Sequence, residues 1–178
     1  PSPRLPKARI PLGFLGSEGV PGRLARPPNP PIEATSGGAH VLAVDRATCG
    51  LYEIYVAGVN DQGDWRGDST ALWDMLNNAS QSRPYGWTSA DAAGLPILPG
   101  LVRSDEVTAG EIRHALRFTV QTTQRRYILP ATHFASDVTD TNAPPMGLRL
   151  RLRPSFNTPG FYGQARVVLE ALKRYGMI

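Results

Sequence analysis

Apolar and polar residues alternate along two neighbouring segments in the first half of the chain. HVLAVD (40–45) and LYEIYVA (51–57) are rich in aromatic and β-branched residues, and the stretch between them, RATCG, contains a glycine. Alternation places successive side chains on opposite faces of a strand, so this pattern predicts a β-hairpin. The runs HALRFTVQ (114–121), RRYILPA (125–131) and MGLRLRLR (146–153) predict three more strands, the last with its leucines inward and its arginines outward.

The end of the chain changes from alternation to a helical spacing of apolar residues. GQARVVLEALKRYGMI (163–178) predicts an amphipathic helix that packs on the domain. The residues expected on its packed face are Ala165, Val168, Leu169 and Leu172.

Three shorter segments predict helical turns. DSTALWDML (68–76) and TSADAAG (88–94) each begin with residues that cap helices, and TAGE (108–111) has the spacing of a capping box. Together the elements predict a mainly β fold with short helical turns and a C-terminal amphipathic helix. The strands are expected to form an antiparallel sandwich or a jelly-roll-like domain, and an α+β fold is the alternative.

The first 37 residues differ from the rest in composition. Nine of the 17 prolines lie in residues 1–31, which predicts a proline-rich extended arm over residues 1–37 followed by a single β-rich globular domain over residues 38–178. Its apolar residues need a surface to cover, either the arm's own domain, which we favour, or a neighbouring subunit. The second case implies self-association through residues 1–35. The apolar residues in question are Ile10, Leu12, Phe14 and Leu15.

Charge and cysteine content narrow the set of partners. The net charge is +4, and residues 1–35 carry five Lys or Arg against two Glu, so the remainder is nearly neutral and no basic face for nucleic acid is expected. No apolar run reaches the ~18 residues of a membrane span. Cys49 is the only cysteine, so no internal disulfide can form. No phosphate-binding loop, nucleophile elbow or metal-ligand spacing occurs, so no cofactor or metal is predicted.

Four acidic residues gather around the segment 86–111 and are candidates for acid–base chemistry. Cleavage of a glycosidic bond needs two carboxyl groups about 5–10 Å apart, and Asp91 with Asp105 or Glu106 is the candidate pair. Each acid also has a structural interpretation, because Asp91 can cap a helix, Asp105 and Glu106 can be solvated, and Glu111 completes the capping box.

The three histidines, His40, His114 and His133, stand at the ends of expected strands. His114 and His133 are candidates for a catalytic base, and hydrogen-bonded structural histidines are the alternative.

Aromatic residues in loops suggest a binding surface. Trp65 lies in GDWRGD, and Tyr85 and Trp87 lie in RPYGWTS, close to the acids and to Arg113. Exposed rings stack on the C–H faces of sugars, while acids and arginines bond the hydroxyl groups. The alternative is that these aromatic side chains pack over the ends of the β core.

Several segments together resemble a family of uncharacterised secreted bacterial proteins. They are HVLAVDRATCGLYEIYVAG, GWTSADAAGLPILPGLVRSDEVTAGEIRHALRFTV, YILPATHFAS, PPMGLRLRL and ALKRYGMI. The resemblance covers roughly residues 30–178, apart from the arm, and implies a secreted or extracytoplasmic location and a related fold. No activity is assigned to that family. Its members also carry an upstream cysteine that can pair with the one matching Cys49 and continue past YGMI, which implies that this chain is trimmed at both ends.

These observations favour an extracytoplasmic protein that binds a polysaccharide or cell-envelope glycan, and that cleaves it if two of the carboxylates converge. The alternative is a structural or assembly protein whose N-terminal arm docks on a neighbouring subunit.

Overall fold

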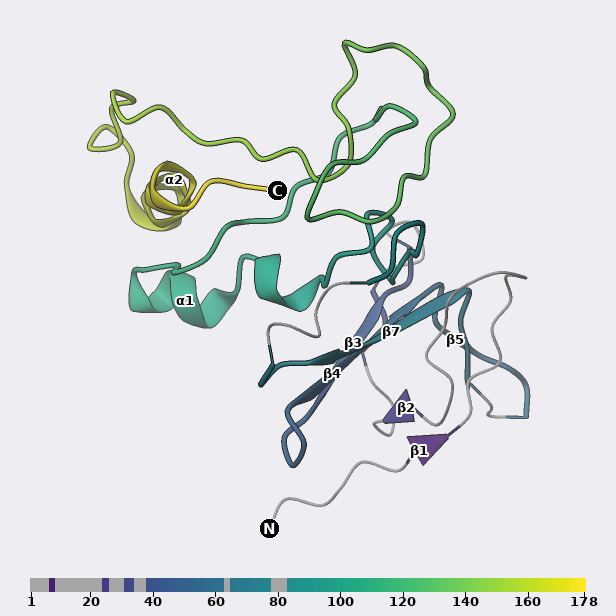
Figure 1. Ribbon diagram of the computed structural model, residues 1–178. Coiled ribbons are helices and arrows are strands. Elements are labelled where there is room, and N and C mark those ends of the chain that lie inside the picture. The colour runs from purple at the N-terminus through teal and green to yellow at the C-terminus, as the bar shows by residue number, and fades with distance from the viewer. Residues whose placement is uncertain (1–6, 9–23, 26–30, 34–37, 63–64, 78–82) are drawn as a thin grey trace.

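A three-stranded antiparallel sheet forms the centre of the N-terminal half in the computed structural model (Figure 1). The structure describes residues 7–8, 24–25, 31–33, 38–62, 65–77 and 83–178. The strands of the sheet are β3 (Val41–Asp45), β4 (Gly50–Tyr55) and β7 (Ser69–Asp74), in the order β3-β4-β7. The hairpin expected over 40–45 and 51–57 is therefore confirmed.

Two pairs of two-residue strands accompany the sheet. β5 (Gly58–Val59) pairs with β6 (Trp65–Arg66), and β1 (Lys7–Ala8) pairs with β2 (Leu24–Ala25) inside the proline-rich arm. The expected mainly β class with antiparallel strands is confirmed, although the described strands supply no second full sheet such as a sandwich would have. The arm residues Ile10, Leu12, Phe14 and Leu15 lie outside the described residues, so their docking stays a prediction.

The segment 68–76 is a strand, and the helix predicted there is wrong. β7 runs antiparallel to β4 and places Trp73 opposite Leu51. Leu51 and Trp73 are buried together with Ala71 on one face of the sheet, where Leu98 packs against them. The unpaired edge of β4 and this apolar contact outweigh a weak local preference for helix.

The opposite face of the sheet is also covered. Val41, Tyr52, Ile54 and Ala57 form a buried cluster there with Trp65. Because both faces are buried, β4 lacks the strict alternation of a half-exposed strand.

The strands predicted at 114–121, 125–131 and 146–153 do not form. These segments pair only through isolated bridges, in which Met177 lies between Leu116 and Leu150 and Tyr127 pairs with Met146. The end of the chain thus occupies the position at which the first and third segments would have paired with each other. Leu150, expected inward, is exposed.

Two short helices lie next to each other to one side of the sheet (Figure 1). α1 (Ser104–Ala109) ends at Gly110, which adopts the left-handed backbone conformation (φ 83°) that glycine tolerates best. The capping box predicted at 108–111 is therefore wrong, because Gly110 terminates a helix there. The segment 88–94 forms turns and not the predicted helix.

The predicted C-terminal helix is confirmed as α2 (Gly163–Arg174). Its apolar face packs on Ile112 and Leu116, which come from the segment after α1. This face differs from the expected one, because Ala165 is exposed and Leu169 is only half-buried. The helix residues that make the contact are Val167, Val168, Ala171 and Leu172.

Ile112 offers a direct test of this packing. Its side chain is 2% exposed in the contact with α2, so Ile112→Ala should lower the free energy of unfolding by about 2–5 kcal/mol through lost burial and a residual cavity. Urea denaturation measures the change. Leu129→Ala is the control, since Leu129 is 67% exposed and its truncation should cost under about 0.5 kcal/mol. Equal losses in the two variants would contradict the docking of α2.

Candidate functional site

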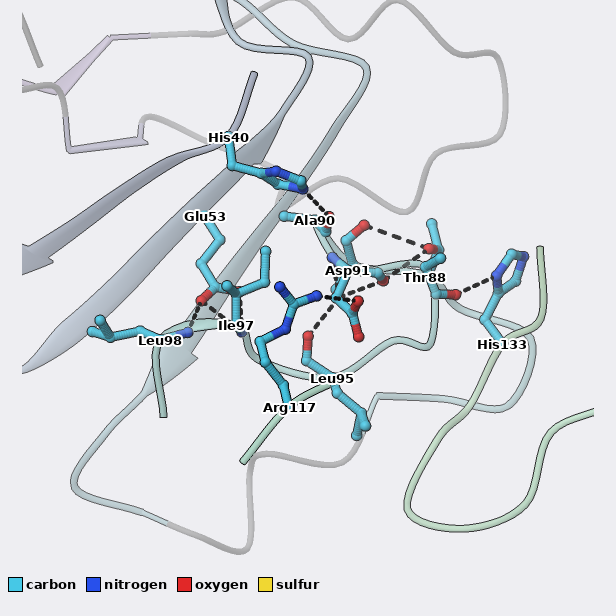
Figure 2. A network of polar contacts seen from close by, with 12 residues as sticks. His40, Glu53, Thr88, Ala90, Asp91, Leu95, Ile97, Leu98, Arg117 and His133 are labelled. Carbon is cyan, nitrogen blue, oxygen red and sulfur yellow. Dashed lines mark hydrogen bonds and ion pairs between the residues drawn. The ribbon is translucent and has the colours of Figure 1, made fainter. Parts of the chain in front are cut away.

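Glu53 lies in the middle of β4 and is completely buried. Its carboxylate accepts hydrogen bonds from the backbone N–H groups of Ile97 (2.8 Å) and Leu98 (2.9 Å) (Figure 2). It also accepts one from Nε1 of Trp73 (3.0 Å). The side chain of one strand residue therefore satisfies the amides of a loop that follows more than 40 residues later in the chain. This contact fastens the segment 95–100 to the face of the sheet.

The pKa of Glu53 is raised above its ordinary value of 4.5, chiefly because burial removes the carboxylate from water. The nearby charge of Asp91 acts in the same direction, while the three N–H donors oppose the shift without cancelling it.

Hydrogen bonds within the turn 87–95 determine its shape. Oγ of Ser89 donates to the carbonyl of Leu95 (2.8 Å) and accepts from the N–H of Asp91 (3.0 Å). A side chain at Gly94 would overlap Thr132, whose hydroxyl donates to the carbonyl of Trp87 (2.8 Å). The turn is thereby tied to the segment 131–133, which lies far from it in sequence.

Two of the three histidines bond to carbonyl groups of this turn. Nε2 of His40 donates to the carbonyl of Ala90 (3.1 Å), and Nδ1 of His133 donates to the carbonyl of Ala92 (2.8 Å) (Figure 2). The other ring nitrogen of His40 lies 2.6 Å from Oε2 of Glu33, and this hydrogen bond lowers the pKa of Glu33. His40 and His133 thus have structural partners, and neither lines the cavity described next.

A cavity of about 390 Å³ lies between the turn and the segments 114–123 and 144–148. Its walls are mostly apolar and include several prolines. Asp91 and Arg117 both line it, and Nη2 of Arg117 lies 2.9 Å from Oδ1 of Asp91 (Figure 2). His114 is a further polar side chain in the wall.

Asp105 and Glu106, the possible partners of Asp91 in a catalytic pair, do not line this cavity. Glu106 lies beside His114, with Oε2 at 3.1 Å from Nε2 of the ring, and its other oxygen is 2.6 Å from Nη2 of Arg103. Asp105 has a side chain that is 77% exposed and pairs loosely with Arg103. The structure therefore brings together Asp91, Arg117 and His114, with Glu106 one contact further away, and does not place two carboxylates side by side in the cavity.

The candidate aromatic residues have different surroundings. The prediction that Trp65 belongs to a binding surface is wrong. Its side chain is only 5% exposed in the core beside the sheet, so its ring is not accessible to a ligand. Tyr85 is 72% exposed and Trp87 is 38% exposed, so both are available. Arg113 lies on the surface, where it pairs with Glu111.

Tyr85 begins a row of four stacked rings, which we call the aromatic ladder: Tyr85, Tyr127, Phe134 and His133. Successive ring centroids lie 6.3, 6.3 and 5.8 Å apart, and the ring planes differ by 30° or less. The guanidinium of Arg125 lies 6.0 Å from the ring of Phe134. Arg83 lies over the rings of both Trp73 and Trp87.

Sequence reasoning identified Asp91, His114 and Tyr85 but missed Glu53, Arg117 and the two central rings of the ladder. Glu53 carried a usable signal, since a single acid in the apolar run LYEIYVA is expensive to bury unless it is bonded. Arg117 and Tyr127 lie in segments interpreted as strands and Phe134 lies just after one, and no local pattern in the sequence indicates that they converge.

Comparison with family models, with curated proteins and with solved structures finds no match. Among the described residues, no helix is long and apolar enough to cross a bilayer. The same part of the chain contains no cluster of three or more His, Cys, Asp or Glu side chains able to hold a metal ion.

Glu53→Gln tests the buried carboxylate. The amide nitrogen cannot accept from the N–H groups that converge here, so the variant should lose about 1–3 kcal/mol of stability near pH 4. The pKa of Glu53 is raised in the folded state. Its contribution to the free energy of unfolding is therefore complete below about pH 4.5 and declines as the pH rises through the folded-state pKa. The gap in unfolding free energy between wild type and Glu53→Gln should therefore narrow from pH 4 to pH 8.

Urea denaturation across this pH range measures the gap. Asp137→Asn is the control, because the side chain of Asp137 is 98% exposed and its removal should leave the pH profile of stability unchanged. A gap that widens with rising pH would contradict the raised pKa.

Proposed function

We propose that this protein is a secreted or extracytoplasmic binder of polysaccharide or cell-envelope glycan, and that the aromatic ladder is its binding surface. The observation that carries the proposal is the row of four stacked rings ending in the highly exposed Tyr85. The resemblance to secreted proteins supports the location.

The chemistry of the ladder suits sugars. Aromatic side chains provide large, rigid, amphipathic contact areas, and a tyrosine adds a hydroxyl that can hydrogen-bond. The guanidinium of Arg125 beside Phe134 and the phenol of Tyr85 supply donors for hydroxyl groups next to the stacked rings. Successive rings allow contact with more than one sugar unit of a chain.

Binding without cleavage is the form of the proposal that the geometry supports. Asp91 is engaged by Arg117, and Glu106 is engaged by Arg103 and His114. A retaining or inverting mechanism needs two carboxyl groups that both reach the sugar, one of them protonated. Asp91 alone lines the cavity among the candidate carboxylates.

The assembly role remains the second candidate. The described arm contact favours attachment to the arm's own domain, because Glu33 donates its backbone N–H to the carbonyl of His40 (3.1 Å) and its carboxylate contacts the His40 ring.

Tyr85→Ala tests the ladder. Loss of one stacked ring should weaken binding to a retained polysaccharide by about 1–3 kcal/mol, the range of a binding hot spot. Affinity electrophoresis on a panel of soluble and insoluble polysaccharides measures it. Tyr162→Ala is the matched control, since Tyr162 is 83% exposed but lies at the start of α2. Failure of the wild-type protein to bind any member of the panel would reject the proposal.

Deletion of residues 1–35 separates the two functional classes. If the arm covers its own domain, the truncated protein should melt at a lower temperature while its mass in solution stays unchanged, because only intramolecular contacts are lost. If the arm joins subunits, light scattering should show an oligomer for the full chain and a folded monomer after truncation. The second result would favour the assembly role.

A further inference from the structure

Two oppositely charged side chains in the cavity wall, Asp91 and Arg117, form an ion pair. Oδ1 of Asp91 contacts Nη2 of Arg117, and within the part of the chain that the structure describes neither Oδ2 of Asp91 nor Nε of Arg117 forms a hydrogen bond. Both side chains are about one-fifth to one-quarter exposed, so a ligand can reach the pair although most of its surface is shielded from solvent. It therefore offers one acceptor and one donor side by side.

Such a pair selects a neutral ligand group. An anion that bonds to Arg117 would be repelled by Asp91, and a cation that bonds to Asp91 would be repelled by Arg117. An amide avoids both costs, because its N–H can donate to Asp91 while its carbonyl accepts from Arg117.

The rest of the cavity adds a requirement for apolar atoms. Its walls carry Leu95, Phe118, Val120, Pro145 and Met146, which favour a methyl group or an aliphatic ring face over free hydroxyls. A volume of about 390 Å³ lies within the usual range of roughly 300–1,000 Å³ for small-molecule sites.

The cavity adjoins the aromatic ladder. Tyr127 of the ladder forms a β-bridge with Met146, a wall residue of the cavity. His133 of the ladder donates to the carbonyl of Ala92, another wall residue. Residues of the ladder are thus bonded directly to residues of the cavity wall.

We infer that the cavity binds the acetamido group of an N-acetylated amino sugar, with its N–H on Asp91, its carbonyl on Arg117 and its methyl group against the apolar wall. The inference rests on the proposed glycan binding and names its substrate class. The ladder supplies stacking for neighbouring sugars of the same chain.

Three oligosaccharides test the inference on the full chain. The β-1,4-linked tetramers of N-acetylglucosamine, glucosamine and glucose share one backbone and differ only at C2, which carries an acetamido group, an ammonium group or a hydroxyl. Isothermal titration calorimetry should show about tenfold tighter binding of the N-acetylated tetramer than of the other two, the size expected for two net hydrogen bonds.

Variants assign the preference to the cavity. Asp91→Ala removes the acceptor, and Ala92→Leu fills the cavity while leaving the ion pair in place. Both should abolish the preference for the acetamido group, whereas Asp105→Ala, which changes a surface acid outside the cavity, should retain it. Thermal melting confirms that each variant is folded. The comparison of the three tetramers uses the wild-type protein and does not depend on the variants.

The outcomes separate the two proposals. Equal binding of all three tetramers, or tighter binding of the ammonium form, would overturn the acetamido inference and leave glycan binding by the ladder intact. A preference that persists after the cavity is filled would also overturn it. Absence of binding to any glycan would overturn the proposed function, and the inference with it.

Discussion

A fully buried carboxylate joins the sheet to the loops that follow it. The carboxylate of Glu53, on β4, accepts hydrogen bonds from two backbone N–H groups of the loop and from one indole N–H. These buried hydrogen bonds hold the segment around Ile97 on the sheet. An unpaired carboxylate at this depth would be very costly, and unpaired amides would be costly as well. The partners therefore require one another, and the loop can take only an arrangement that presents both amides to Glu53.

From this anchor the loop builds the walls of the cavity. Asp91 stands in the turn that Ser89 and Gly94 shape, and the segment 131–133 holds the same turn from the opposite side through Thr132 and His133. Arg117 then reaches Asp91 from a third segment. The contacts that Thr132, His133 and Arg117 make with the turn join residues more than 25 positions apart, so the cavity exists only when all three segments are folded.

The charged groups near the cavity are arranged in pairs, which bears on the chemistry we propose. The guanidinium groups of Arg117 and Arg103 neutralise Asp91 and Glu106, and His114 completes the second pair. Paired charges in a shielded site suit the recognition of neutral polar groups that we propose. A protein that hydrogen-bonds an amide group and stacks on sugar rings is consistent with this arrangement.

The sequence by itself determined the elements whose signals are local. The hairpin around RATCG and the helix α2 follow from alternation and helical spacing. Tertiary structure alone decided the rest. Segment 68–76 became a strand because β4 offered an edge, and the three alternating runs formed only isolated bridges, two of them with Met177. It also brought Asp91 to Arg117, since a contact between distant residues depends on how loops close and leaves no periodicity in the sequence.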